Sequence, residues 1–289
     1  MTSPLRHTLV RALTALGASA LTLTACTQPH PASLEHTDRI TPSAATAPPS
    51  ASVPPSAGDR LRHLADTITA QPGDTKDPHT HRYSYLRTQS WDRATAEVAR
   101  TDETWWRAAD GTGRAVTRRL PARRDLTRMP TAAEQRQLAA AEASTDQYPD
   151  RGRLSGILAE PLPTDPGVLT AKLFEHQPAD TGPQALLWAF CDLARYHYLD
   201  RDVRAASLRV LATIDGLTYA GETRDLAGRT ALAFRLDSAN NRDTILLDPR
   251  TGRLLARTQN VTTSPPALFT HAVFLDADRV ARPGEVPAP

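Results

Sequence analysis

Apolar and polar residues alternate in two separate parts of the chain. Between residues 81 and 120, and again between 218 and 275, apolar side chains recur at every second position, which is typical of half-buried strands. Short turns rich in Asp, Asn and Gly separate these stretches, so the pattern predicts antiparallel neighbours. The predicted strands are 81–91, 95–107, 113–120, 218–223, 230–237, 243–247, 253–260 and 267–275.

Helical spacing of apolar residues appears before and between the two groups of strands. A short amphipathic helix is predicted over 59–70. Thr131 and Glu134 have the spacing of a capping box, and Asp165 before Pro166 has that of a helix start. The predicted helices of the middle region are 131–142, one that opens at 165–166, the strongly apolar 183–198, and 200–214.

The order of these elements predicts the fold class. Helices inserted between two groups of strands favour an α+β domain, in which one antiparallel sheet carries helices on one face. We therefore expect a curved sheet, a half-barrel of about eight strands, in a single domain that covers residues 59–289. The apolar helix 183–198 is expected to be enclosed against this sheet.

The N-terminus has the pattern of a secretory signal. Arg6 and Arg11 precede an uncharged, largely apolar stretch from Ala12 to Thr24. As a helix this stretch would span about 20 Å, which is too short for a bilayer core of about 30 Å. The pattern therefore predicts a signal peptide over residues 1–25 rather than a transmembrane helix.

The end of this stretch, Leu23-Thr24-Ala25-Cys26, resembles the bacterial lipobox. The resemblance implies cleavage between Ala25 and Cys26 and a thioether-linked diacylglyceryl group on Cys26, with the acyl chains in the membrane. Two acyl chains hold a protein stably at a membrane, whereas one does not. The expected location is the outer face of the bacterial cytoplasmic membrane, facing the cell wall. The alternative is an ordinary secretory signal with an incidental cysteine.

Residues 26–58 are predicted to be a lipidated, disordered tether. They are rich in Pro, Ala, Ser and Thr and nearly lack large apolar side chains, so they cannot bury enough surface to offset the entropy of ordering. A segment of this kind would hold the domain away from the membrane.

The net charge of the mature chain agrees with anchoring by a lipid. Cleavage removes Arg6 and Arg11 and no acidic residue, so the 34 basic residues become 32, equal to the 32 acidic ones. A neutral mature chain argues against nucleic-acid binding and against anchoring by a polybasic patch. With only two cysteines the chain is not a disulfide scaffold, and Cys191 in the apolar helix is expected to be a buried, inert thiol.

Catalytic motifs are absent from the sequence. It contains no Gly-x-Ser-x-Gly, no phosphate-binding loop, no dinucleotide fingerprint and no His-Glu-x-x-His. His79 and His81 could share a strand face, but no third metal ligand is signalled nearby. We therefore predict no enzyme activity, no metal and no cofactor. Glu97, Asp102 and Glu103 could supply acid–base groups only if the protein were an unrecognised hydrolase.

Seven segments carry a resemblance to a known family: 83–89, 103–106, 110–114, 162–166, 208–211, 225–229 and 247–255. Together they resemble an uncharacterised family of actinobacterial membrane-anchored envelope proteins. The order of elements is also similar to the lipoprotein-carrier fold of LolA-like and RseB-like envelope proteins. That resemblance implies helices against the concave face of a half-barrel and a cavity that binds acyl chains or lipidated partners.

Three functional hypotheses remain open on the sequence. The first is a non-catalytic envelope lipoprotein whose domain binds or senses an apolar or lipidated ligand. The second is a solidly packed module that binds an envelope protein partner, and the third is the hydrolase. A cavity between sheet and helices would favour the first, and a filled core with no pocket above about 300 Å³ would favour the second. The residues expected to line such a cavity are Tyr83, Tyr85, Trp105, Trp106, Phe190 and Phe234.

Overall fold

The structure is a computed structural model that describes residues 55–288, apart from 75, 77, 95–96, 124–130, 151–153, 155 and 264–265. The predicted signal peptide, Ala25, Cys26 and almost all of the predicted tether lie outside the described residues. No helix in the described part of the chain is both long and apolar enough to span a membrane.

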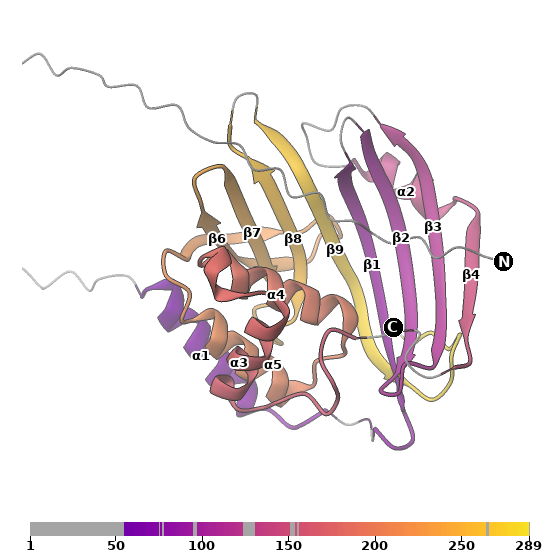
Figure 1. Cartoon of the computed structure of the whole chain (residues 1–289), viewed down its shortest axis with the longest axis horizontal. Coiled ribbons are helices and arrows are strands. Elements are labelled where there is room, and N and C mark those ends of the chain that lie inside the picture. The colour runs from indigo at the N-terminus through magenta and orange to yellow at the C-terminus, as the bar shows by residue number, and fades with distance from the viewer. Residues whose placement is uncertain are drawn as a thin grey trace, which may run out of the picture. The chain divides into compact units, whose positions relative to one another are not determined.

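A nine-stranded antiparallel sheet forms the framework of the domain (Figure 1). Its strand order is β4-β3-β2-β1-β9-β8-β7-β6-β5, so the last strand of the chain, β9, pairs with the first, β1. The strands are β1 (Tyr83–Ala94), β2 (Glu97–Ala108), β3 (Gly113–Arg123), β4 (Ala143–Tyr148), β5 (Thr218–Arg224), β6 (Thr230–Asp237), β7 (Asn241–Leu247), β8 (Leu254–Val261) and β9 (Ala267–Val280).

The strand that the sequence pattern missed is β4. It pairs with β3 from Gly113↔Tyr148 to Arg118↔Ala143 and forms one edge of the sheet. Its residues are nearly all exposed, so no apolar alternation marks it in the sequence. The other eight predicted strands are present, and the α+β class with a curved, open antiparallel sheet is confirmed.

Four helices cover one face of the β6–β9 part of the sheet (Figure 1). They share with the sheet a large apolar core, in which Leu61, Leu173, Phe190, Leu208 and Phe234 are almost fully buried. The cap predicted at Asp165 is confirmed, and Asp200 accepts a hydrogen bond from the Val203 amide in the same way. The helices are α1 (Ala57–Thr69), α3 (Pro166–His176), α4 (Gln184–Tyr196) and α5 (Arg201–Leu211), and a 3₁₀ turn (Ala179–Thr181) precedes α4.

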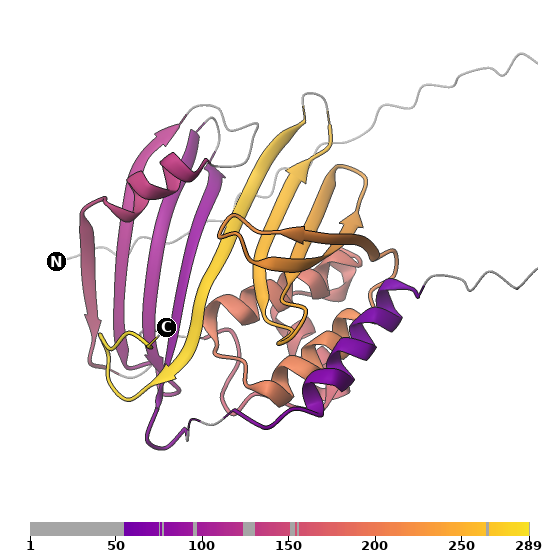
Figure 2. The same cartoon turned by 180° about the vertical axis from the view of Figure 1, so that it is seen from behind.

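The fifth helix, α2 (Ala132–Ala139), lies on the opposite face of the sheet (Figure 2). The capping box of Thr131 and Glu134 is present as predicted. Leu138 is fully buried against Trp91 and Val98. Trp91 of β1 packs against α2, whereas Leu86 of the same strand faces α4. Because these two residues project from opposite faces of β1, the sheet lies between α2 and α4. The expectation that all helices share one face therefore holds for four helices and is corrected for α2.

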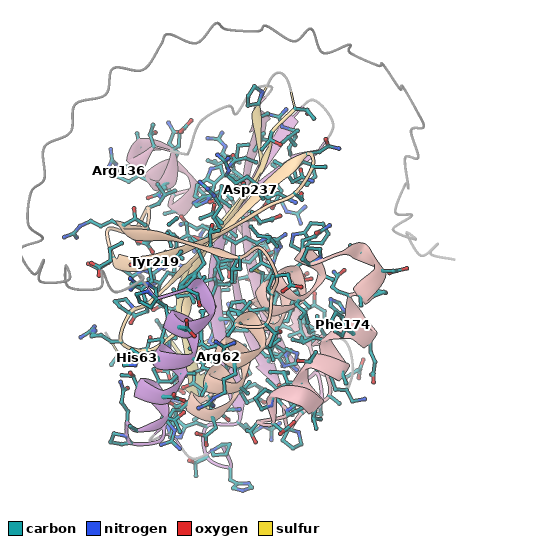
Figure 3. The ribbon with its side chains drawn as sticks, turned by 90° about the vertical axis from the view of Figure 1, so that its left-hand side faces the viewer. Arg62, His63, Arg136, Phe174, Tyr219 and Asp237 are labelled. Atoms are coloured by element: carbon teal, nitrogen blue, oxygen red, sulfur yellow. The ribbon has the colours of Figure 1, made fainter. Side chains whose placement is uncertain are left out.

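The β5–β6 hairpin curls back toward the β8–β9 pair. In its turn Arg229 donates to the carbonyl oxygens of Leu255 (3.2 Å) and Phe274 (2.8 Å), and it also pairs with the fully buried Asp225. At the other end Tyr219 of β5 lies beside α1, with the Arg60 guanidinium 4.1 Å from its ring centroid (Figure 3). Register shifts within five of the strand pairs allow the sheet to bend in this way.

Candidate functional site

The space between sheet and helices was the expected ligand site, and it is almost filled. The pocket there is partly open to solvent and has a volume of about 90 Å³. Ligand pockets of about 300–1,000 Å³ are usual for molecules of drug size, so no such ligand fits without rearrangement. Leu86 of β1, Phe190 and Ala194 of α4 and Phe274 of β9 form its apolar wall. Arg229, Arg253 and Asp276 add polar groups to the lining.

The six residues predicted to line a cavity do not come together. Phe190 lines the small cavity, and Phe234 is fully buried in the same core, with its ring 5.5 Å from that of Tyr219. Trp105 lies on the helix face but only half-buried, with its ring 5.3 Å from that of Tyr196 at the end of α4.

The remaining three lie on the other side of the sheet. Tyr85 and Trp106 are buried side by side, with ring centroids 5.6 Å apart, and Tyr83 packs against them. Strand alternation explains this outcome, because Tyr85 and Leu86 must project from opposite faces and Leu86 faces α4. Tyr85 and Trp106 instead line an open groove of about 360 Å³ on the α2 face.

A buried polar cluster closes one end of the interlayer space. Arg107 of β2, Glu160 and His197 meet there, and the side chains of Arg107 and His197 are almost fully buried. The Arg107 guanidinium donates to the Glu160 carboxylate and to the Tyr196 carbonyl oxygen (3.0 Å). His197 Nδ1 lies 3.2 Å from Glu160 Oε1, and the Leu158 amide donates to His197 Nε2 at 3.3 Å.

Burial and charge set the ionisation of the cluster. The Leu158 amide donates to Nε2 of His197, while Nδ1 faces both the Glu160 carboxylate and, at 2.9 Å, Nη2 of Arg107. Burial lowers the pKa of His197, and the bond to Glu160 offsets only part of that effect. Burial opposes ionisation of Glu160, but the His197 hydrogen bond and the Arg107 charge lower its pKa to about 2.

Glu160 is unsuited to acid–base catalysis near neutral pH. A general acid or base works best when its pKa lies close to the working pH. The pKa of Glu160 is about 2, so its carboxylate is held ionised. The three residues connect β2 to the end of α4.

An open cleft borders the cluster on the outside. It has a volume of about 510 Å³, and Glu160, Leu162, Tyr198 and Arg279 contribute to its walls. His79 also lies there, and no group of three or more potential metal ligands occurs among the described residues. Cys191 is buried as expected, and burial raises the pKa of its thiol to about 12, which makes it unreactive.

Sequence reasoning missed two sets of residues. Arg107, Glu160 and His197 are far apart in the chain, and no local pattern connects them. Arg114 and Arg118 in the groove on the α2 face are different, since the alternation Arg114-Ala115-Val116-Thr117-Arg118 places two arginines on one face of a strand. That signal was present in the sequence.

Comparisons with known proteins complete the description. The sequence matches no protein-family model and no curated protein. Solved structures of MucB show a distant likeness. The complex of MucA and MucB from Pseudomonas aeruginosa is similar with a TM-score of 0.32 and 17% identity over 79% of this chain and 59% of that chain. A second structure, of MucB with MucA(peri), has a TM-score of 0.32, 18% identity and coverage of 79% and 57%. The chain thus spans less than two thirds of the solved chains that it resembles.

Proposed function

We propose that the protein is a non-catalytic interaction module of the bacterial cell envelope, held at the outer face of the cytoplasmic membrane by a lipid on Cys26. Its domain binds a protein partner through its surface. In this proposal the segment that follows Cys26, rich in Pro, Ala, Ser and Thr, provides the reach between membrane and domain.

One observation carries the choice of a surface over an internal site. The layer between sheet and helices is packed, and only about 90 Å³ remains free. An acyl chain or lipidated ligand would need several times that volume, and it would have to displace Phe190, which is almost fully buried. The polar cluster of Arg107, Glu160 and His197 closes one end of the same layer.

A carrier of apolar ligands is the second candidate, favoured by the position of Phe190 in the wall of the cavity. The two functions differ in what the purified protein holds. The domain is produced in bacteria with export to the cell envelope, where it can meet lipids. Native mass spectrometry of the purified domain should then give the mass of the polypeptide alone. A fluorescent fatty acid should show no saturable binding up to about 100 μM. A co-purifying lipid or saturable binding of the probe would overturn the proposal in favour of the carrier.

The anchor has its own test. Cys26→Ser in the full chain should abolish incorporation of radiolabelled palmitate and leave the protein unprocessed or released. Cys191→Ser is the matched control, because Cys191 is buried, and it should incorporate label normally. Incorporation that persists in Cys26→Ser would contradict lipidation at this position.

The tether is tested by deletion. Removal of residues 27–54, which spares the α1 cap Ser56 and the buried Ala57, should leave the free energy of unfolding of the domain unchanged within about 1 kcal/mol, the scale of an ordinary surface change. A larger loss, measured by urea denaturation, would mean that these residues pack on the domain.

A further inference from the structure

The open groove on the α2 face combines an aromatic floor with arginine walls. Its volume is about 360 Å³, and Tyr85, Trp106 and Val116 line its base. Arg87, Arg114 and Arg118 also line it, and Ala139 at the end of α2 borders it. We call these ten residues the arginine groove: Tyr85, Arg87, Thr104, Trp106, Arg114, Val116, Arg118, Ala139, Gly284 and Val286.

The arginine groove holds positive charge that no carboxylate of the described residues neutralises at Arg114 or Arg118. Arg87 pairs with Asp102 at 3.1 Å, and the Asp102 side chain is fully buried beneath it. Arg114 lies with its guanidinium carbon 5.5 Å from the Trp106 ring centroid, and its buried Nε has no hydrogen-bond partner. Within the described part of the chain, no carboxylate forms an ion pair with Arg114 or Arg118. Two guanidinium groups are therefore left for an external anion.

The protein's own C-terminal residues already place a main chain at one end of the arginine groove. Trp106 Nε1 donates a hydrogen bond to the carbonyl oxygen of Glu285. The Glu285 carboxylate turns away and accepts from the amides of Ala281 (3.2 Å) and Arg282 (3.3 Å). The groove thus contacts peptide main chain, but the Glu285 carboxylate forms no ion pair with the arginines of the groove. Val286, the next residue, is 66% exposed.

We propose that the arginine groove binds an extended acidic segment of a partner protein, with carboxylates of that segment paired to Arg114 and Arg118. This inference rests on the proposed function and assigns the chemistry of the partner. A guanidinium presents a planar fork of donors that matches a carboxylate in bidentate geometry. The aromatic floor takes the aliphatic parts of the segment, and Trp106 shows that a main-chain carbonyl is also bound there.

A peptide suits the arginine groove better than a phosphate or a lipid headgroup. Free phosphate needs converging donors and gains nothing from a floor of Tyr85, Trp106 and Val116. Such a floor favours a ligand that carries apolar groups and carboxylates in alternation, as an extended peptide does on one face.

Fluorescence anisotropy with a labelled ten-residue peptide of alternating Glu and Val tests this inference. The matched probe has Gln in place of each Glu. The Arg114→Gln/Arg118→Gln variant should bind the acidic peptide at least about fivefold more weakly than the unmodified domain, which corresponds to about 1 kcal/mol. The control, Arg119→Gln/Arg250→Gln, removes the same charge from exposed arginines outside the groove and should change affinity less than about twofold. Raising ionic strength should weaken binding.

Three results would overturn the inference. They are no binding of the acidic peptide, equal binding of the Gln peptide, and equal losses in the two double variants. Arginine-dependent binding of phosphatidylglycerol vesicles or of inorganic phosphate, without peptide binding, would assign the arginine groove to those anions instead. If the acidic peptide does not bind and native mass spectrometry finds no lipid, an acidic partner segment is excluded, but the proposed function as a protein-interaction module is not. A bound lipid would exclude the proposed function itself.

Discussion

The two halves of the sheet differ in what covers them and in what they bury. Four helices lie against β6–β9, and the residues between them are almost all apolar, from Leu61 in α1 to Phe234 in β6. On the β1–β3 side the eight-residue α2 and the C-terminal residues cover the opposite face, as far as the structure describes the chain. There Arg87, Gln89 and Asp102 form a polar layer under the arginine groove.

This difference indicates that one half of the sheet provides most of the stability, whereas the other half offers the proposed binding surface. Apolar burial is the main stabilising contribution in folding, and most of it lies in the helix-covered half. Buried polar atoms without hydrogen-bond partners among the described residues occur in both halves, for example Trp91 Nε1 in β1 and Arg235 Nε in β6, so they do not distinguish the two. Such atoms cost free energy wherever they lie. Four predictions test the comparison, from the largest expected effect to the smallest.

Phe190→Ala should cost the most, because Phe190 is almost fully buried in the helix-covered half. Loss of burial and the cavity left behind should lower the free energy of unfolding by about 3–5 kcal/mol. Urea denaturation measures this, with Val168→Ala on the exposed surface of α3 as the control, which should stay within about 0.5 kcal/mol. A loss below about 1 kcal/mol, together with binding of an apolar probe, would show that this half is underpacked and houses a ligand.

The polar half should make stability depend on pH. Burial lowers the pKa of His271 to about 4, against 6.5 for the ordinary side chain. Below pH 6.5 the unfolded chain takes up a proton at this position and the folded protein does not. The free energy of unfolding should therefore fall as pH decreases from 6.5 to 4, by about 3 kcal/mol. His197, whose pKa is also lowered by burial, acts in the same direction.

His271→Gln isolates that contribution. Thermal unfolding followed from pH 7 to 4 should show a shallower decline in this variant than in the unmodified protein. His63→Gln, on the exposed face of α1, is the control and should leave the pH dependence unchanged. An identical slope in all three proteins would mean that His271 is not the group that titrates.

Glu160→Gln should weaken the connection between the two halves. It removes the carboxylate that pairs with Arg107, whose side chain is 2% exposed, and so leaves a buried charge without its counter-ion. Because Glu160 is itself partly exposed, we expect a loss of about 2 kcal/mol, below the range for a fully buried pair. Glu175→Gln removes an exposed partner of Lys172 and should cost less than about 0.5 kcal/mol in the same assay. Equal effects of the two changes would show that the cluster does not join the halves.

Arg118→Gln should have the smallest effect on stability. Arg118 forms no ion pair with any described residue, so its loss should change the free energy of unfolding by less than about 0.5 kcal/mol. A destabilisation above about 1 kcal/mol would assign Arg118 to the fold rather than to the arginine groove, and the contrast between the halves would weaken.

Much of the local structure was predictable because it depends on neighbours in the chain. Apolar alternation located eight strands, and the capping box of Thr131 and Glu134 and the cap at Asp165 began helices where expected. The edge strand β4 was not predictable in this way, because its exposed polar residues follow no apolar period. The backbone of an edge strand pairs with its neighbour whatever its side chains cover.

The candidate site was less predictable than the fold. Alternation correctly separates Tyr85 from Leu86, but it does not say which face of β1 meets the apolar helix. In the structure Leu86 faces α4, whereas Tyr85 and Trp106 form the floor of the arginine groove. Aromatic content alone therefore pointed to one cavity, whereas the residues divide between two faces of the sheet.

The sequence by itself determined the α+β class, the order of most elements and the face relationships within each strand. It also contains the run Leu23–Cys26 that resembles a lipobox, on which the predicted anchor depends. Only the tertiary structure decided that α2 and α4 lie on opposite faces of the sheet, that the layer under α4 is filled, and that Arg107 and His197 meet Glu160 across 53 and 37 residues of chain. The physical reason is range, since periodicity and capping act over one or two turns, while contacts between distant residues form only when whole elements pack together.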